Sequence, residues 1–385
     1  MLKLWNLNLI VVTFVLTILG TFLTRSGVLS SVHAFTTGTI GYYFLGFIAV
    51  VLLFAFALVA GNGEKLRAPG RFDSVLSRDT IFLLNNLFLT AFMFTVLLGT
   101  LYPLVAEAIR GVKVSVGAPF FNKMTLPLCA SLLFLMGVGP ALPWRQATAE
   151  QAKRKLLPPT IAAALVALVS VLLGTRAPYA VAAFAFGAFA LVANVGEYAI
   201  AVRARSRTTG EGPAIALARL VRSHRRYGGY LAHIGVVIIA VGIAASSAFR
   251  AEYDATLRPG QTMQAGNFEL RLLQLWARDE PQRTVVGADV AVLRDGRAVG
   301  TLTPRTNFYP TSQEPVPTPG VRSRPAGDLY VNMMTFAEDG SSATVRVIVE
   351  PLVPWIWFGG GVVCVGALIA MFASRSPAGV PGEAA

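Results

Sequence analysis

The chain has 385 residues, 54% of them hydrophobic and 14% charged, with a mean hydropathy of +0.60 and a formal net charge of +13. Because its apolar residues recur in blocks of bilayer length, this composition excludes a single water-soluble core and indicates an integral membrane protein. The positive charge does not indicate nucleic-acid binding, because the one long polar segment, 249–350, holds 11 basic and 12 acidic residues.

The apolar blocks predict a membrane all-α fold, a polytopic bundle of about eight transmembrane helices. Each block has roughly 18 to 25 residues, enough for a helix to cross the hydrocarbon core. The first block is not typical of a cleavable signal peptide, since no small-residue cleavage pattern follows it and a short loop leads directly to the second. The predicted spans are 5–23, 41–60, 80–104, 124–142, 158–175, 180–202, 229–248 and 351–372.

The distribution of Lys and Arg predicts which loops face the cytoplasm, because short cytoplasmic loops retain basic residues. The loops on one side hold 4, 4 and 7 basic residues, whereas the three short loops on the other side hold 5 in total. The first set is 65–78, 145–155 and 203–226, and the second is 24–40, 105–123 and 176–179. Both termini are therefore expected in the cytoplasm.

Between the seventh and eighth spans, the hydrophobic pattern changes from continuous runs to alternation, which is typical of strands. The alternating segments are 268–272, 288–293 and 344–349, and Arg294-Asp-Gly-Arg is a hairpin-turn signal. We therefore predict a small extracytoplasmic β domain, in which the Pro-rich stretch 314–325 forms a loop. This segment contains no His and no Cys, so docking or scaffolding is its expected role.

These patterns divide the chain into three predicted parts. Residues 1–248 form a seven-helix transmembrane region whose first external loop, 24–40, is a candidate functional loop because it holds Arg25 and His33. Residues 249–350 form the β domain, and 351–385 form the last transmembrane helix with a cytoplasmic tail.

Several common site chemistries find no support. The two cysteines, Cys129 and Cys364, lie inside predicted spans and far apart, which favours neither a disulfide framework nor a cysteine metal site. The haem-attachment motif C-x-x-C-H is absent, so the chain is not itself a c-type cytochrome. Phosphate-binding glycine loops and a serine nucleophile elbow are absent too.

His33 is the first candidate ligand, since an unprotonated imidazole nitrogen can coordinate iron. It lies in the first external loop, eight residues after Arg25, in a segment too apolar for an ordinary solvated loop. The alternative is an interfacial histidine beside a snorkelling arginine at a helix end.

His233 lies about one turn inside the seventh span, where an imidazole is desolvated and needs a partner. It is a haem ligand or proton relay, or it forms a hydrogen bond to a neighbouring helix. The nearby Gly228, Gly229 and Gly235 would leave room for a flat macrocycle, although small residues also serve plain helix packing.

Glu197 in the sixth span lies at a similar depth and is a candidate acceptor for the ring N–H of His233, which would hold the imidazole in one tautomer. The alternative is that the Glu197 carboxylate extends toward the cytoplasmic arginines and does not contact His233. His224, among several arginines, is expected to be a solvated loop residue.

Through almost its whole length, the chain resembles the C-terminal part of the CcmF family, membrane haem lyases of bacterial cytochrome c maturation. A collinear set of strings supports the resemblance: Leu23-Thr-Arg-Ser-Gly-Val-Leu-Ser-Ser-Val-His-Ala-Phe, Leu84-Asn-Asn, Gly99-Thr-Leu-Tyr-Pro-Leu, Val114-Ser-Val-Gly-Ala-Pro-Phe-Phe-Asn, Leu231-Ala-His-Ile-Gly, Asn307-Phe-Tyr-Pro, Asp328-Leu-Tyr-Val and Pro354-Trp-Ile-Trp. Nitrite-reductase-linked paralogues share much of this set, so the cytochrome that is matured stays open.

The resemblance implies that His33 is one of two external histidines that hold incoming substrate haem, with Arg25 as a partner for a propionate. It also implies that His233 is one of two intramembrane ligands of a permanent b-type haem. The implied partners are a CcmE-like haem chaperone, apocytochrome c and its CcmH-like thiol-handling protein, in the bacterial inner membrane.

The family's N-terminal half, which carries the other two histidines, does not lie within these residues. A truncated gene, a split protein with a separate N-terminal half and a degenerate remnant are all open, and one half alone is expected to be inactive. A non-catalytic assembly subunit is the alternative function. A solute permease is less favoured, because intramembrane charges are few and no pair of related helix bundles is evident.

Overall fold

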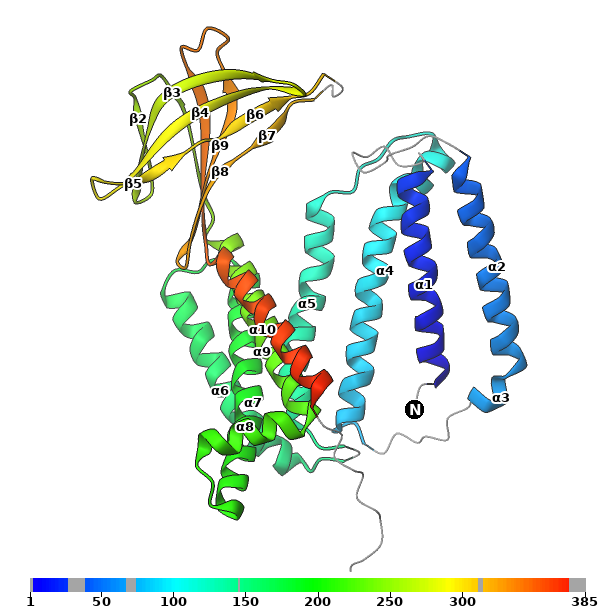
Figure 1. Ribbon diagram of the computed structural model, residues 1–385. Coiled ribbons are helices and arrows are strands. Elements are labelled where there is room, and N and C mark those ends of the chain that lie inside the picture. Colours follow the sequence, from blue (N-terminus) through cyan, green and yellow to red (C-terminus); the bar gives the residue numbers. More distant parts are fainter. Residues whose placement is uncertain (1–2, 27–38, 67–73, 145, 311–313, 374–385) are drawn as a thin grey trace, which may run out of the picture. The chain divides into compact units, whose positions relative to one another are not determined.

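The computed structural model describes residues 3–26, 39–66, 74–144, 146–310 and 314–373 (Figure 1). Eight helices of this described part are long and apolar enough to cross a membrane, which confirms the predicted polytopic bundle. These eight are α1 (Lys3–Arg25), α2 (Ile40–Gly61), α4 (Arg78–Arg110), α5 (Ala118–Ala141), α6 (Ala149–Leu172), α7 (Pro178–Thr209), α9 (Arg225–Ala248) and α10 (Val353–Phe372). Two shorter helices are α3 (Gly63–Leu66) and α8 (Pro213–Ser223).

The chain forms two compact units. The first comprises Met1–Val75 and Leu89–Thr125, and the second comprises Leu76–Phe88 and Leu126–Ala385. In the first unit, Gly99 of α4 lies against the rings of Phe120 and Phe121 of α5, so closely that a Cβ at Gly99 would lie 2.6 Å from Phe121. Two of the strings that carry the family resemblance therefore meet in space.

In the second unit, α9 and α10 pack through small residues along antiparallel paths. A Cβ at Gly228 would lie 2.4 Å from the Ala370 backbone nitrogen, and one at Gly235 would lie 2.7 Å from the Gly359 carbonyl oxygen. Such contacts let two helix backbones approach closely, which is how small residues stabilise helix pairs in lipid.

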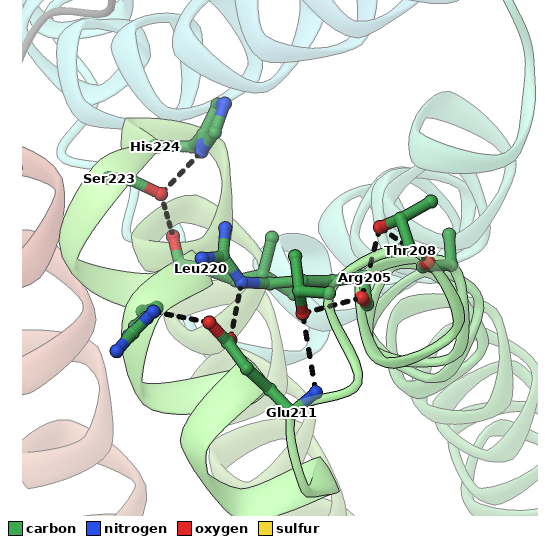
Figure 2. A network of polar contacts seen from close by, with 9 residues as sticks. Arg205, Thr208, Glu211, Leu220, Ser223 and His224 are labelled. Atoms are coloured by element: carbon green, nitrogen blue, oxygen red, sulfur yellow. Dashed lines mark hydrogen bonds and ion pairs between the residues drawn. The ribbon is translucent and has the colours of Figure 1, made fainter.

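Polar contacts at one end of α7 position the short helix α8. Gly210 ends α7 with φ of 68°, a left-handed conformation that favours glycine. Glu211 then accepts a 2.9 Å hydrogen bond from Arg205 Nε and pairs with Arg219 of α8 (Figure 2). The hydrogen bond from Arg205, together with the charges of Arg205 and Arg219, holds the pKa of the Glu211 carboxyl below its usual range.

The β domain is a sandwich of two antiparallel sheets. One has the strand order β1-β10-β9-β8, the other has the order β2-β3-β4-β6-β7, and β5 pairs with β4. The strands are β1 (Ala251–Leu257), β2 (Thr262–Ala265), β3 (Phe268–Glu280), β4 (Arg283–Arg294), β5 (Arg297–Leu302), β6 (Arg305–Phe308), β7 (Val316–Thr318), β8 (Gly320–Arg324), β9 (Gly327–Phe336) and β10 (Ala343–Pro351). Alternate residues of both sheets fill its core, including Leu270, Val290, Val331 and Val347.

The three predicted strand segments lie in β3, β4 and β10, and Asp295 and Gly296 form the predicted turn with positive φ angles. The loop predicted over 314–325 is wrong, because it contains β7 and β8. Both are edge strands of their sheets, where a proline such as Pro317 is tolerated. Asn307 also holds β7 in place by donating hydrogen bonds to the Val316 carbonyl and the Thr318 hydroxyl, each 3.0 Å long.

The turn between β8 and β9 contacts the start of α10. Trp355 Nε1 donates a 2.9 Å hydrogen bond to the carbonyl of Pro325, and the Leu352 nitrogen donates a 3.3 Å bond to the carbonyl of Ala326. Leu352 precedes α10 with φ of 59°, so the chain bends sharply from the last strand into the helix.

Candidate functional site

His233 of α9 lines a cavity of about 210 Å³ within the second unit. The cavity lies between α9, the first turns of α4 and the last turns of α5, and most of its wall is apolar. Its lining residues are Arg78, Ile81, Phe82, Asn85, Leu135, Met136, Gly139, Pro140, Trp144, Tyr230 and His233. A volume of this size is below that of a complete small-molecule pocket, about 300 to 1,000 Å³.

Asn194 of α7 determines which nitrogen of His233 is protonated. The amide nitrogen of Asn194 donates to two carbonyls, that of Met136 at 3.2 Å and that of Ala190 at 2.8 Å. Its amide oxygen is therefore the atom that lies 3.3 Å from His233 Nδ1. Because that oxygen can only accept, Nδ1 carries the proton and Nε2 keeps its lone pair.

Arg78 brings positive charge to the same cavity and is held firmly by α5. Its Nε donates to the Gly139 carbonyl at 3.0 Å, and its Nη2 donates to the Pro140 carbonyl at 2.7 Å. The guanidinium lies 5.3 Å from the ring centroid of Trp144, which stacks on Phe82 at 5.6 Å. The cavity thus combines one imidazole, one fixed cation and a wall of aromatic and aliphatic groups.

This set of donors fits a haem better than a bare metal ion. Structural and catalytic metal ions take three or four protein ligands, and the described residues contain no cluster of three His, Cys, Asp or Glu side chains suited to a metal. A haem brings four nitrogens of its own, so each axial position needs only one protein atom, and a single imidazole lone pair supplies it.

The predicted contact between Glu197 and His233 is wrong. Glu197 instead forms an ion pair with Lys155 of α6, with 2.9 Å between Nζ and the carboxylate oxygen. The side chain that reaches His233 is that of Asn194, about one helical turn earlier on α7. The competing cation on α6 explains the difference, since the ion pair with Lys155 satisfies the Glu197 carboxylate.

For two of the three glycines near His233, the alternative of plain helix packing is confirmed and the predicted space for a macrocycle is wrong. Gly228 and Gly235 lie against the backbone of α10 and serve helix packing. Gly229 has no atom within 4 Å of where its Cβ would stand.

The remaining histidines differ in how far the structure describes them. His224 lies between α8 and α9, where its Nδ1 is 2.7 Å from the Ser223 hydroxyl, so it is a partnered junction residue (Figure 2). His33 lies outside the described residues. Arg25 is the last residue of α1 and is exposed, so the external pair of His33 and Arg25 stays a prediction.

Sequence reasoning missed Asn194, Arg78 and Tyr230 as neighbours of His233. Asn194 did carry a usable signal, because an amide inside an apolar helix is costly unless it is hydrogen-bonded across helices. Tyr230 also carried one, because it lies three residues before His233 on α9 and such residues share a helix face. Arg78 gave none, since its approach depends on how α4 and α5 pack against α9.

Comparison with known proteins finds a matching family and several similar proteins. Residues 248–351 match the family described as "CcmF C-terminal beta-sandwich". The cytochrome c-type biogenesis protein CcmF of Pseudomonas aeruginosa is 34% identical over 375 residues, which cover 97% of this chain and 56% of that protein. CycK of Bradyrhizobium diazoefficiens is 33% identical over 385 residues, covering 100% of this chain and 58% of that protein.

A solved structure described as "Cytochrome c Heme Lyase CcmF" is similar with a TM-score of 0.70 and 31% identity, over 96% of this chain and 54% of that one. The chain thus spans a little over half the length of its relatives. In the described part of the chain, eight apolar helices with a β-sandwich between the last two define a multi-pass membrane protein, and its relatives are proteins of cytochrome c-type biogenesis. Within that class, the chain corresponds to the C-terminal portion of the CcmF/CycK/NrfE family.

Proposed function

We propose that the chain is the C-terminal part of a membrane haem lyase that positions haem for thioether attachment to apocytochrome c. The observation that carries the proposal is the lone pair of His233 Nε2, kept free by Asn194 beside an apolar cavity, in a chain related to CcmF proteins. The proposed location is the bacterial inner membrane, with both termini in the cytoplasm and the β domain in the periplasm.

His233 would be an axial ligand of a b-type haem. The cavity accounts for part of such a ligand, so other groups of the family's N-terminal half would complete the site. When bound, this haem would supply reversible one-electron chemistry. The chain's own contribution is an oriented imidazole, a largely apolar wall and the Arg78 cation.

His33 would hold the substrate haem on the external side, with Arg25 bound to a propionate. The haem would arrive from a CcmE-like chaperone, and a CcmH-like protein would present the reduced thiols of the apocytochrome. In each attachment, the thiol sulfur bonds to one carbon of a vinyl group and a proton is added to the other carbon. The cytochrome's own histidine would then replace His33 on the haem.

The yield of holocytochrome c separates this proposal from a non-catalytic assembly subunit. The chain would be co-produced with the N-terminal half of a CcmF relative, the haem chaperone and an apocytochrome. We expect His33→Ala to remove most of the holocytochrome, while His224→Ala, a matched histidine at the α8–α9 junction, keeps the wild-type yield. An unchanged yield with His33→Ala would favour the assembly subunit.

Asn194 is proposed as a positioning residue for His233. Asn194→Leu removes the acceptor of the Nδ1 proton, and haem affinity should fall by about 10- to 100-fold. Asn194→Asp keeps the acceptor for Nδ1 and adds negative charge, although it loses the bonds to the Met136 and Ala190 carbonyls. It should therefore retain more haem than Asn194→Leu and lower the haem's midpoint potential. Haem content and potentiometric titration of the three proteins would check this, and identical values in all three would contradict it.

A further inference from the structure

A second and larger cavity, of about 970 Å³, lies in the second unit between the end of α5, the first half of α6, α7 and the start of α9. Its lining contains a single acidic residue, Glu197, among the described residues that form it. Five basic residues line it, contributed by four elements: Arg78, Arg154, Lys155, Arg203 and Arg226.

The charges of this basic cavity do not cancel. Glu197 is already paired with Lys155 at 2.9 Å, which leaves four guanidinium groups on the wall. Arg78 is held by two backbone carbonyls, and these neutral acceptors do not remove its charge. Arg154 and Arg203 are exposed. A cavity with this balance attracts an anion, and guanidinium groups bind phosphate oxygens in a bidentate manner.

Apart from Gln151 and Tyr230, the remaining side chains of the wall are mainly apolar, which favours a lipid over a soluble anion. Pro158, Pro159, Ala193 and Ile200 lie on the lining, on helices that continue as membrane spans. The positive-inside rule by itself would only place Arg and Lys in this set of loops. It does not require that basic residues from α4, α6, α7 and α9 converge on one cavity with an apolar side.

We propose that the basic cavity binds the phosphodiester headgroup of an anionic phospholipid, with an acyl chain along its apolar wall. Basic pockets between membrane helices bind anionic headgroups in this manner. His233 does not line the basic cavity, although the two cavities adjoin and share Arg78, Pro140, Trp144 and Tyr230. Lipid binding would brace α6, α7 and α9 around the ion pair between Lys155 and Glu197.

The test uses two double variants that remove the same charge from the same two helices. Arg154→Gln with Arg203→Gln alters the cavity, whereas Lys153→Gln with Arg207→Gln alters exposed residues that do not line it. Arg78 stays intact in both, so the cavity of His233 is not disturbed. The full chain in detergent would be titrated with phosphatidylglycerol, phosphatidylcholine or inorganic phosphate, with lipid retention followed by native mass spectrometry and stability by thermal melting.

We expect phosphatidylglycerol to be retained and to raise the Tm of the wild type and of the control variant, with little effect of phosphatidylcholine. The cavity variant should bind phosphatidylglycerol at least about tenfold more weakly, as expected for the loss of charged hydrogen bonds. Equal retention of the two lipids, an equal loss in the control variant, or displacement of the lipid by inorganic phosphate at matched concentration would overturn the proposal.

Discussion

Replacing His233 with Ala is expected to abolish the b-type haem absorption of this chain when it is purified from membranes together with the family's N-terminal half. The Nε2 lone pair of His233 is the proposed iron ligand, and the Nδ1–H bond to Asn194 selects the neutral tautomer in which Nε2 carries that lone pair. Without it, haem content should fall to the background level, because an iron that lacks one of its axial ligands binds weakly and loses its low-spin spectrum. Haem content per protein and the reduced absorption spectrum check this.

His224→Ala is the matched control, because it removes a histidine nine residues earlier that does not line the cavity. It should leave both the haem content and the spectrum unchanged. Wild-type haem content in His233→Ala would show that the cavity around His233 is not the haem site.

Gly228→Leu is expected to prevent stable folding of the second unit. Even its Cβ would stand 2.4 Å from the Ala370 nitrogen and 2.5 Å from the Gly366 oxygen, and both are backbone atoms that cannot swing away. The helices α9 and α10 would have to separate, at a cost at or above the roughly 1 to 3 kcal/mol of an overpacked core. We expect a large drop in Tm, or no detergent-stable protein, by fluorescence-detected size-exclusion chromatography.

Gly229→Leu tests the same substitution on the same helix at the neighbouring position. No atom lies within 4 Å of its Cβ position, so the protein yield and Tm should stay near those of the wild type. Equal losses in both variants would mean that the close contact with α10 does not decide the outcome.

The membrane spans could be predicted from composition because a bilayer demands a long apolar run, whatever the neighbouring helices are. Their ends could not. The fifth span was predicted from residue 158, yet α6 begins at Ala149. A capping box starts it there, with Thr148 and Gln151 exchanging hydrogen bonds between side chain and backbone. Pro158 and Pro159 then lie inside the helix, where proline usually marks an end.

In the β domain, the alternating hydrophobic pattern predicts the central strands but does not predict the edge strands. Central strands such as β4 bury alternate side chains, so their pattern survives in the sequence. The edge strands β7 and β8 are short, and β7 has a proline at its centre. Only the pairing of β7 with β6 and of β8 with β9 makes them strands. The division of the chain at residues 248 and 350 into three parts stays a prediction.

At the site, His233 could be found from sequence because an ionisable group inside a membrane helix calls for a function or a partner. Its partner could not be found in the same way. Glu197 and Asn194 both lie on α7 about one turn apart, and the choice depends on the position of Lys155 on α6. Arg78 approaches from a helix more than a hundred residues away in the chain, which no local pattern encodes.

The most direct test of a haem site at His233 is chemical rescue by imidazole. His233→Gly would be co-purified with the family's N-terminal half, and the absorption spectrum would be recorded before and after imidazole is added. If His233 supplies an axial nitrogen, the variant should lack the low-spin b-type spectrum and regain it with imidazole, which would occupy the space left in the cavity. A variant that keeps the wild-type spectrum without imidazole would contradict the assignment, as would one that remains unchanged when imidazole is added.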